Sequence, residues 1–588
     1  MSDTHTDPWL APLASALSHD RARACLTGVH GATAAFALTQ LACALATARP
    51  ARPWVILTAT DESAEQLVND LRFFHELTGV SADALAWFPE WETLPYEATP
   101  PHVGLIAHRM RTLHQLHATP ATVLVTSVSA AMHRLMPREA FVSATLTFRP
   151  GESCERERLT AGLLRLGYRR VSVVEIPGEF SVRGGIVDIF STAYADPIRI
   201  EFLGDTVESI RCFDPATQTS TERLHTGLVL PAREFLRPAE AADAAAPIPP
   251  DAEWRSPELY ERMGTLFDYL PAAPILSLDQ PSALKAACDS AWERIDDGYL
   301  RHADRDDDAP YPSPERLFLT WEEILTATAG WPVLALEPLT PPDASWTPAI
   351  HFPGQPPASA GLGIRGTPFS QTLSLLEQLR EAYRMVLVAR SRGQVERLLA
   401  LFREHDLPAV EWRPAAWARP GTGKASFAIL HGALSSGFLS SDLRLAILTE
   451  EELFAKGARH KPQPKSKAAT FLSSLEDLNA GDYVVHVQHG IAKYRGLKRL
   501  TVQDFESDYL ILEFFGGDTL YVPLDRLNQV QRYSGAEGHV PRLDRLGGTS
   551  WAKTTARVKK DIEEMAQELI DLYANRELVQ RASYGGPS

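Results

Sequence analysis

Short apolar, strand-like runs separated by helical stretches are the feature that most constrains the fold of this chain. In residues 25–128, two such runs lie at residues 54–58 and 122–126 and consist of apolar and β-branched side chains. Residues 62–77, between them, place apolar side chains at helical spacing. Strands that alternate with helices in this way are typical of α/β domains. We therefore predict an α/β fold for this region.

Residues 129–214 follow a different pattern, in which short strands dominate. We expect strands at residues 171–176, 185–190, 198–202 and 207–213. The pairs Gly184-Gly185 and Gly204-Asp205 are turn formers and separate them. This stretch is predicted to be a small sheet-rich insert within the α/β region.

The length of 588 residues exceeds what one hydrophobic core can organise, so the chain must divide into several domains. We expect an α/β multidomain protein. Its predicted segments are the first part of an α/β domain (25–128), the sheet-rich insert (129–214), the second part of the same domain (215–345), an additional α/β domain (346–455), a basic linker (456–473), a compact β domain (474–543) and a segment with a long amphipathic helix (544–588).

Composition excludes several classes of protein. The net charge of −16 argues against a chain that wraps DNA nonspecifically, because neutralising phosphates requires clustered Lys and Arg. The five cysteines form no CxxC pair, so neither a zinc site nor a disulfide framework is expected, and a reducing cytoplasm fits. No apolar run reaches about 18 residues, so we expect no membrane span.

A glycine-containing stretch near the start is similar to a phosphate-binding loop that has lost its chemistry. Gly28 and Gly31 remain, but Ala34 stands at the position of the phosphate-binding Lys and Ala35 at that of the magnesium-binding Ser or Thr. Neither alanine can hold a phosphate or a metal ion. An unrelated turn is the alternative interpretation of these residues taken alone.

An acidic pair further along favours the phosphate-loop interpretation. Asp279 follows an apolar strand-like run and could bind magnesium, but Gln280 stands where a carboxylate would polarise the attacking water. Two defects at complementary positions make ATP hydrolysis here improbable. We therefore predict no catalytic residue and no bound cofactor in this chain.

The insert and its surroundings resemble the excinuclease subunit UvrB. The resemblance lies in residues 167–190 and 199–214, combined with the degenerate phosphate loop. UvrB keeps an intact loop and carries a Tyr-rich hairpin that inserts into DNA. Here the shorter stretch 88–97 stands in its place. That short form is similar to the UvrB-like module of transcription-repair coupling factors (Mfd).

The compact β domain makes the resemblance more specific. Residues 481–494, 508–514 and 520–524 resemble the RNA-polymerase-interacting domain that Mfd shares with CarD-type regulators, which implies a Tudor-like β-barrel. The helix after Trp551 is similar to the segment that leads into the family's translocase motor. The order of modules is thus that of the N-terminal part of the family. The resemblance places the motor, with its ATP and Mg, outside these 588 residues.

The resemblance implies two partners and their contact residues. In the insert it implies binding of UvrA, with Arg170 and Arg183 at positions of UvrB arginines and Phe180 as an aromatic anchor. Ion pairs of these arginines with Glu175 or Glu179 are the alternative.

In the β domain the resemblance implies contact with the RNA polymerase β subunit through a strand-loop after Gly496. The residues concerned are Leu497, Lys498, Arg499 and Leu500. An exposed strand edge there could take up a partner strand. The alternative is that Leu500 belongs to the core and the cations are solvated.

The expected function is that of an adaptor in transcription-coupled nucleotide-excision repair, active as a monomer. Duplex DNA would be engaged mainly by the family's motor. Two alternatives stay open: a UvrB-type DNA-dependent ATPase, which would need nucleotide at residues 28–35, and a CarD-like transcription regulator, which would bind polymerase without UvrA. Arg170 and Arg183 discriminate between them.

Overall fold

The structure is a computed structural model that describes residues 9–454, 482–532 and 543. Within these ranges the residues not described are 49–51, 82–83, 98, 120–121, 216, 238–247, 271–273, 304–310, 342, 364–368, 413–426, 487–488, 503–504 and 524–529. The chain divides into two compact units, an N-terminal unit (1–457) and a C-terminal unit (458–588). None of the helices in the described part is long and apolar enough to cross a membrane.

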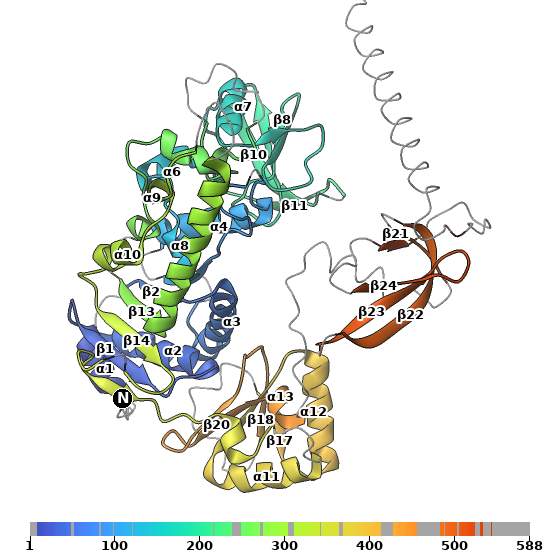
Figure 1. The fold of residues 1–588 in the computed structure, drawn as a ribbon. Coiled ribbons are helices and arrows are strands. Elements are labelled where there is room, and N and C mark those ends of the chain that lie inside the picture. Colours follow the sequence, from blue (N-terminus) through green and yellow to red (C-terminus); the bar gives the residue numbers. More distant parts are fainter. Residues whose placement is uncertain are drawn as a thin grey trace, which may run out of the picture. The chain divides into compact units, whose positions relative to one another are not determined.

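A seven-stranded parallel sheet organises the first part of the N-terminal unit. Its order is β15 (Ala349–His351), β1 (Arg23–Thr27), β14 (Val333–Glu337), β13 (Ile275–Asp279), β2 (Trp54–Thr58), β4 (Val123–Ser127) and β3 (Leu85–Phe88). Figure 1 shows β1, β14, β13 and β2 side by side. The predicted strand at residues 54–58 is confirmed, and that at 122–126 is found one residue later.

Helices cover both faces of this sheet. Along β2, Val55 and Leu57 belong to one apolar core, whereas Trp54 and Ile56 belong to another. This alternation explains why the strand is apolar throughout. The helices are α1 (Leu10–Leu17), α2 (Ala32–Ala48), α3 (Asp61–Thr78), α4 (Val103–Ala118), α5 (Val128–Met132), α6 (Arg138–Ala144), α8 (Pro281–Ala303), α9 (Pro314–Leu317) and α10 (Trp321–Ala327).

The sheet-rich insert is built on a six-stranded sheet. Its order is β11 (Ser220–Arg223), β10 (Thr206–Phe213), β9 (Ile198–Leu203), β8 (Ile186–Ile189), β7 (Glu179–Arg183) and β6 (Arg169–Arg170), antiparallel except between β6 and β7. Helix α7 (Arg156–Arg165) and the pair β5 (Leu146–Phe148) and β12 (Gly227–Val229) pack with it. The strand predicted at residues 171–176 is wrong, because these residues form turns between β6 and β7.

A second α/β domain, built on a five-stranded sheet, follows within the N-terminal unit. Its order is β17 (Ala409–Glu411), β18 (Phe427–His431), β16 (Arg384–Ala389), β20 (Leu445–Thr449) and β19 (Phe438–Ser440), with only β19 antiparallel. Helices α11 (Phe369–Ala382), α12 (Arg392–Glu404) and α13 (Glu450–Phe454) enclose its own apolar core. The mixed α/β multidomain class is thereby confirmed.

The described part of the C-terminal unit is one antiparallel sheet. Its order is β24 (Thr519–Pro523), β23 (Phe505–Glu513), β22 (Gly490–Val502), β21 (Tyr483–His486) and β25 (Val530–Arg532). A small core packs on it, formed by Val484, Ala492, Leu510, Leu512, Phe514 and Val522. The predicted basic linker (456–473) and the predicted helix within 544–588 lie outside the described residues.

Candidate functional site

The stretch predicted to be a degenerate phosphate loop, residues 28–35, begins between the first strand of the parallel sheet and the helix that follows. Strand β1 ends at Thr27, and α2 begins at Ala32. Gly28 and Gly31 have φ angles of 77° and 53°, a left-handed region that glycine adopts without strain. Ala34 is partly buried and Ala35 fully buried. This stretch is therefore a strand-to-helix turn with two glycines of positive φ, and the alanines at positions 34 and 35 carry neither a charge nor a hydroxyl.

Asp279 lies at the same end of the sheet, where the parallel strands have their carboxyl ends. Asp279 is the last residue of β13, which a single strand, β14, separates from β1. Burial raises the pKa of Asp279 to about 6, partly offset by a hydrogen bond from Gln280. Burial and the nearby Asp279 also raise the pKa of Glu337, at the end of β14. In the described part of the chain, no group of three or more acidic, His or Cys side chains could hold a metal ion.

Replacing Asp279 by Asn is expected to increase stability at neutral pH. A folded-state pKa above the unfolded value means that the folded protein binds the extra proton between about pH 4 and 6. Asp279 therefore costs stability as pH rises through this window, up to about 3 kcal/mol. In urea titrations, the free energy of unfolding of Asp279→Asn should exceed that of the unaltered chain only slightly at pH 4.5 and most at pH 7.5. Asp297→Asn, at an exposed position, controls for loss of one charge. A gain independent of pH would contradict this assignment.

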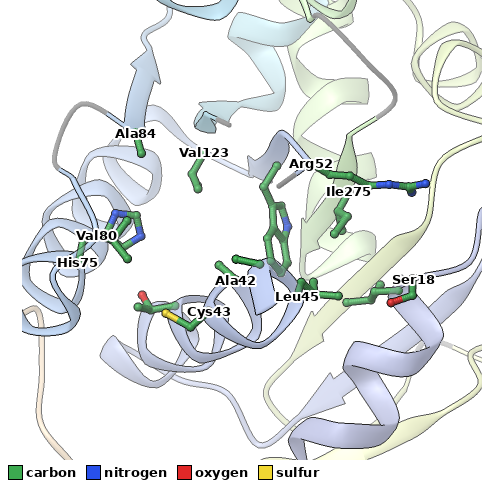
Figure 2. A pocket seen from close by; sticks show the side chains of 14 residues that line it. Ser18, Ala42, Cys43, Leu45, Arg52, His75, Val80, Ala84, Val123 and Ile275 are labelled. Carbon is green, nitrogen blue, oxygen red and sulfur yellow. The ribbon is translucent and has the colours of Figure 1, made fainter. Parts of the chain in front are cut away.

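An apolar cavity of about 250 Å³ lies at the opposite end of the same sheet, where the parallel strands begin (Figure 2). The first residues of three strands line it, namely Trp54, Val123 and Ile275, together with Cys43 and His75. None of the predicted site residues borders it. The cavity is therefore separate from the loop and the acidic position.

The two arginines predicted in the insert are both exposed, on neighbouring strands. Arg170 ends the edge strand β6, and Arg183 ends β7. Arg183 donates hydrogen bonds to the carbonyl oxygen of Ser172 (2.9 Å) and to Ser181 Oγ (3.4 Å). Arg170 forms no side-chain hydrogen bond or ion pair with any residue that the structure describes. Both guanidinium groups are therefore accessible to a partner.

Glu179 has a different cation as its partner. It is buried, pairs with Arg169 at 2.5 Å and accepts hydrogen bonds from the amides of Glu175 and Ile176. Neither Arg170 nor Arg183 takes part. The alternative in which these two arginines pair with Glu175 or Glu179 is not what the structure shows.

The prediction that Phe180 offers an aromatic anchor is wrong. Its side chain is 0% exposed, lies in the core of the insert and stands opposite Ile189 on β8. A ring without accessible surface cannot contact a partner. Val173 (42% exposed) and Ile176 (46% exposed), in the segment between β6 and β7, are exposed apolar side chains of the insert.

The residues predicted to contact polymerase lie in a strand rather than in a strand-loop. Leu497, Lys498, Arg499 and Leu500 are part of β22, which continues to Val502. On one side they pair with β23, with Leu497 opposite Leu510 and Leu500 opposite Ser507. On the other side β21 pairs only with residues 490–493. The far half of β22 thus has one strand edge that no other described strand covers.

Three known domains match this chain in order. The UvrB interaction domain matches residues 146–235, the MFD D3 domain residues 378–453, and the CarD-like/TRCF RID domain residues 478–534. The chain therefore belongs to the class of multidomain proteins in which a UvrB-type interaction domain precedes a CarD-like domain.

Similarity to whole proteins narrows this class. The chain is 31% identical over 582 residues to the transcription-repair-coupling factor of Myxococcus xanthus, covering 91% of this chain and 48% of that protein. It is 28% identical over 579 residues to the factor of Staphylococcus aureus strain MRSA252, covering 90% and 47%. The chain spans about half the length of the curated relatives that it matches. It corresponds to the N-terminal portion of the transcription-repair coupling factors, which confirms the family resemblance.

Proposed function

We propose that this chain acts as a repair-coupling adaptor that binds UvrA through the insert and RNA polymerase, at its β subunit, through the C-terminal unit. The observation that carries the proposal is the presence of two interaction domains of different kinds in two separate compact units. Because the units are separate, one partner can be held without occupying the surface that binds the other.

The insert offers a surface suited to an acidic partner. Arg170 and Arg183 lie at the ends of adjacent strands, and the Ser172 carbonyl holds the second guanidinium. Arginine binds carboxylates in a bidentate manner. The exposed Val173 and Ile176 supply the apolar area that an interface centre needs. We assign these four exposed residues to UvrA binding as separate candidate contacts on the insert.

The C-terminal unit offers a strand edge. Along residues 497–502, every second residue points its backbone amide and carbonyl away from β23, to the side where no described strand pairs with β22. An extended segment of a partner can bind such an edge by β-augmentation. We assign this edge to the polymerase β subunit, and we propose that the unit as a whole has the Tudor-like barrel fold.

No nucleotide chemistry is assigned to the chain itself. Ala34 and Ala35 give the loop neither a cation for phosphates nor a hydroxyl for magnesium, and Gln280 cannot act as a carboxylate. We propose that no cofactor binds here, that ATP and Mg belong to the family's motor, and that duplex DNA is engaged mainly by that motor. We further propose that the chain works as a monomer in the cytoplasm.

Binding assays with single substitutions test the two surfaces separately. Arg170→Ala and Arg183→Ala should each weaken UvrA binding by about tenfold or more and leave polymerase binding unchanged. Leu500→Arg should do the reverse. Arg223→Ala is the matched control, because Arg223 is exposed on β11, the opposite edge strand of the same sheet. Equal losses from Arg223→Ala and Arg170→Ala would refute the assigned surface, and polymerase binding without UvrA binding would favour the CarD-like regulator.

A further inference from the structure

The loop between β18 and β19 lies directly against the degenerate phosphate loop. Its residues 432–437 belong to the additional α/β domain, whereas the phosphate loop precedes α2 of the first domain. The amide of Ala32, the first residue of α2, donates to Ser436 Oγ at 3.4 Å. A Cβ placed on Gly31 would lie 1.9 Å from the same oxygen. A hydroxyl of this chain thus occupies the space immediately above the loop.

Two other amides of this stretch also have internal partners. The amide of His30 donates to Thr33 Oγ1 at 2.7 Å, and the amide of Thr33 donates to the His30 carbonyl oxygen at 3.2 Å. Amides at this position would hold phosphate oxygens in a working loop, because the first amides of a helix have no partner within it. Here the amides of Ala32, His30 and Thr33 donate instead to Ser436 Oγ, Thr33 Oγ1 and the His30 carbonyl oxygen.

Contacts on both sides of Ser436 fix the β18–β19 loop in place. Ser435 donates to the carboxylate of Asp70 on α3 twice, from its amide (2.7 Å) and from its hydroxyl (2.6 Å). Asp70 is buried. Gly432 lies so close to Phe73 that an added Cβ would be 2.4 Å from the ring. Phe438 then packs against Phe36 of α2, with ring centroids 5.3 Å apart.

We propose that the phosphate nest of the first domain has become an internal docking site, in which the Ser436 hydroxyl takes the place of a phosphate oxygen. The β18–β19 loop fastens the additional domain to the first domain without nucleotide. This inference concerns residues 28–35 and 432–437 only, and it does not depend on UvrA or polymerase.

Hydrogen exchange of the full chain tests this docking. Gly31→Ala forces Ser436 away, so the amides of residues 430–440 should exchange about tenfold faster or more, as expected for loss of a hydrogen bond to a charged group at Ser435. Gly79→Ala is the matched control, because Gly79 also has a positive φ of 74° but has no atom within 4 Å of its added Cβ. It should leave residues 430–440 unchanged. Equal exchange of these residues in the two variants would overturn the proposal.

Two further hydrogen-exchange measurements test the docking without relying on a variant that could fail to fold. Ser436→Gly removes the hydroxyl without a new clash and should speed exchange of the Ala32 amide. In the unaltered chain, neither inorganic phosphate nor Mg-ATP should slow exchange in residues 28–35. Protection of these residues by either compound would show that the nest is still open to phosphate, and the docking assignment would then be wrong.

Discussion

Replacing Arg109 by alanine is expected to destabilise the N-terminal unit by about 3–5 kcal/mol, because it leaves a buried carboxylate without its cation. Arg109 has no exposed surface and binds Glu234 through two nitrogens, at 2.5 and 3.1 Å. A third nitrogen donates to the Pro89 carbonyl oxygen at 2.6 Å. After the substitution, Trp91 Nε1 at 2.9 Å is the hydrogen-bond donor that still reaches Glu234. Urea unfolding followed by tryptophan fluorescence measures the loss.

A surface ion pair provides the control for Arg109. Arg390 pairs with Glu451 at 3.2 Å, and both side chains are at least half exposed. Arg390→Ala should therefore cost less than about 1 kcal/mol. Replacing both Arg109 and Glu234 by leucine should recover much of the loss, because no uncompensated charge is then buried. A loss for Arg109→Ala no larger than that for Arg390→Ala would mean that the Arg109–Glu234 pair is solvated.

Truncating Phe180 to alanine is expected to unfold the insert rather than to remove a contact with a partner. The side chain is fully buried among apolar residues of the insert, so its loss should cost about 3–5 kcal/mol. UvrA binding should fall together with the folded fraction of the insert. Hydrogen exchange of β7 to β10, measured beside UvrA binding, separates folding from binding.

Two other substitutions distinguish a core role from an interface role. Phe180→Leu keeps most of the buried volume and should cost less than about 1.5 kcal/mol and preserve binding. Arg183→Ala should leave exchange in the insert unchanged and still weaken binding, since its guanidinium is exposed. If Phe180→Ala left exchange unchanged but removed binding, the ring would be reaching the partner after all.

Local sequence patterns were sufficient for much of the fold. The apolar, β-branched runs at β2 and β4 specify strands buried on both faces, and the structure has them within one residue. Gly28 and Gly31 were interpreted as part of a phosphate-binding loop or of an unrelated turn, and both residues have positive φ angles. These features depend on neighbours in the sequence, which is why they could be predicted.

The errors concern contacts between distant residues. Residues 171–176 are apolar and β-branched enough to suggest a strand, yet Val173 and Ile176 are exposed. The strand β7 begins instead at Glu179, whose buried carboxylate is satisfied by Arg169 and two backbone amides. The pairing of β7 with β8 sets which face of the sheet the Phe180 side chain occupies, and this face is the core of the insert. No periodicity in the sequence reveals such partners.

The contact between Ser436 and the stretch 28–35 could not be predicted from the sequence at all. Ala32 and Ser436 are 404 residues apart, and a serine between small residues gives no indication of its partner. The residues predicted to bind polymerase illustrate a milder case. These residues were expected in a strand-loop after Gly496, whereas β22 continues through them to Val502 because it pairs with β23.

The proposed adaptor holds two partners at once on one chain, and mixing the three proteins is the direct test of this. The chain, UvrA and the polymerase β subunit are mixed in pairs and then all together, and the masses of the complexes are measured by mass photometry. We expect both pairwise complexes and a ternary complex that contains one copy of this chain, with UvrA lost on Arg183→Ala and the β subunit lost on Leu500→Arg. Two partners that exclude each other, or a failure of either pair to form, would contradict it.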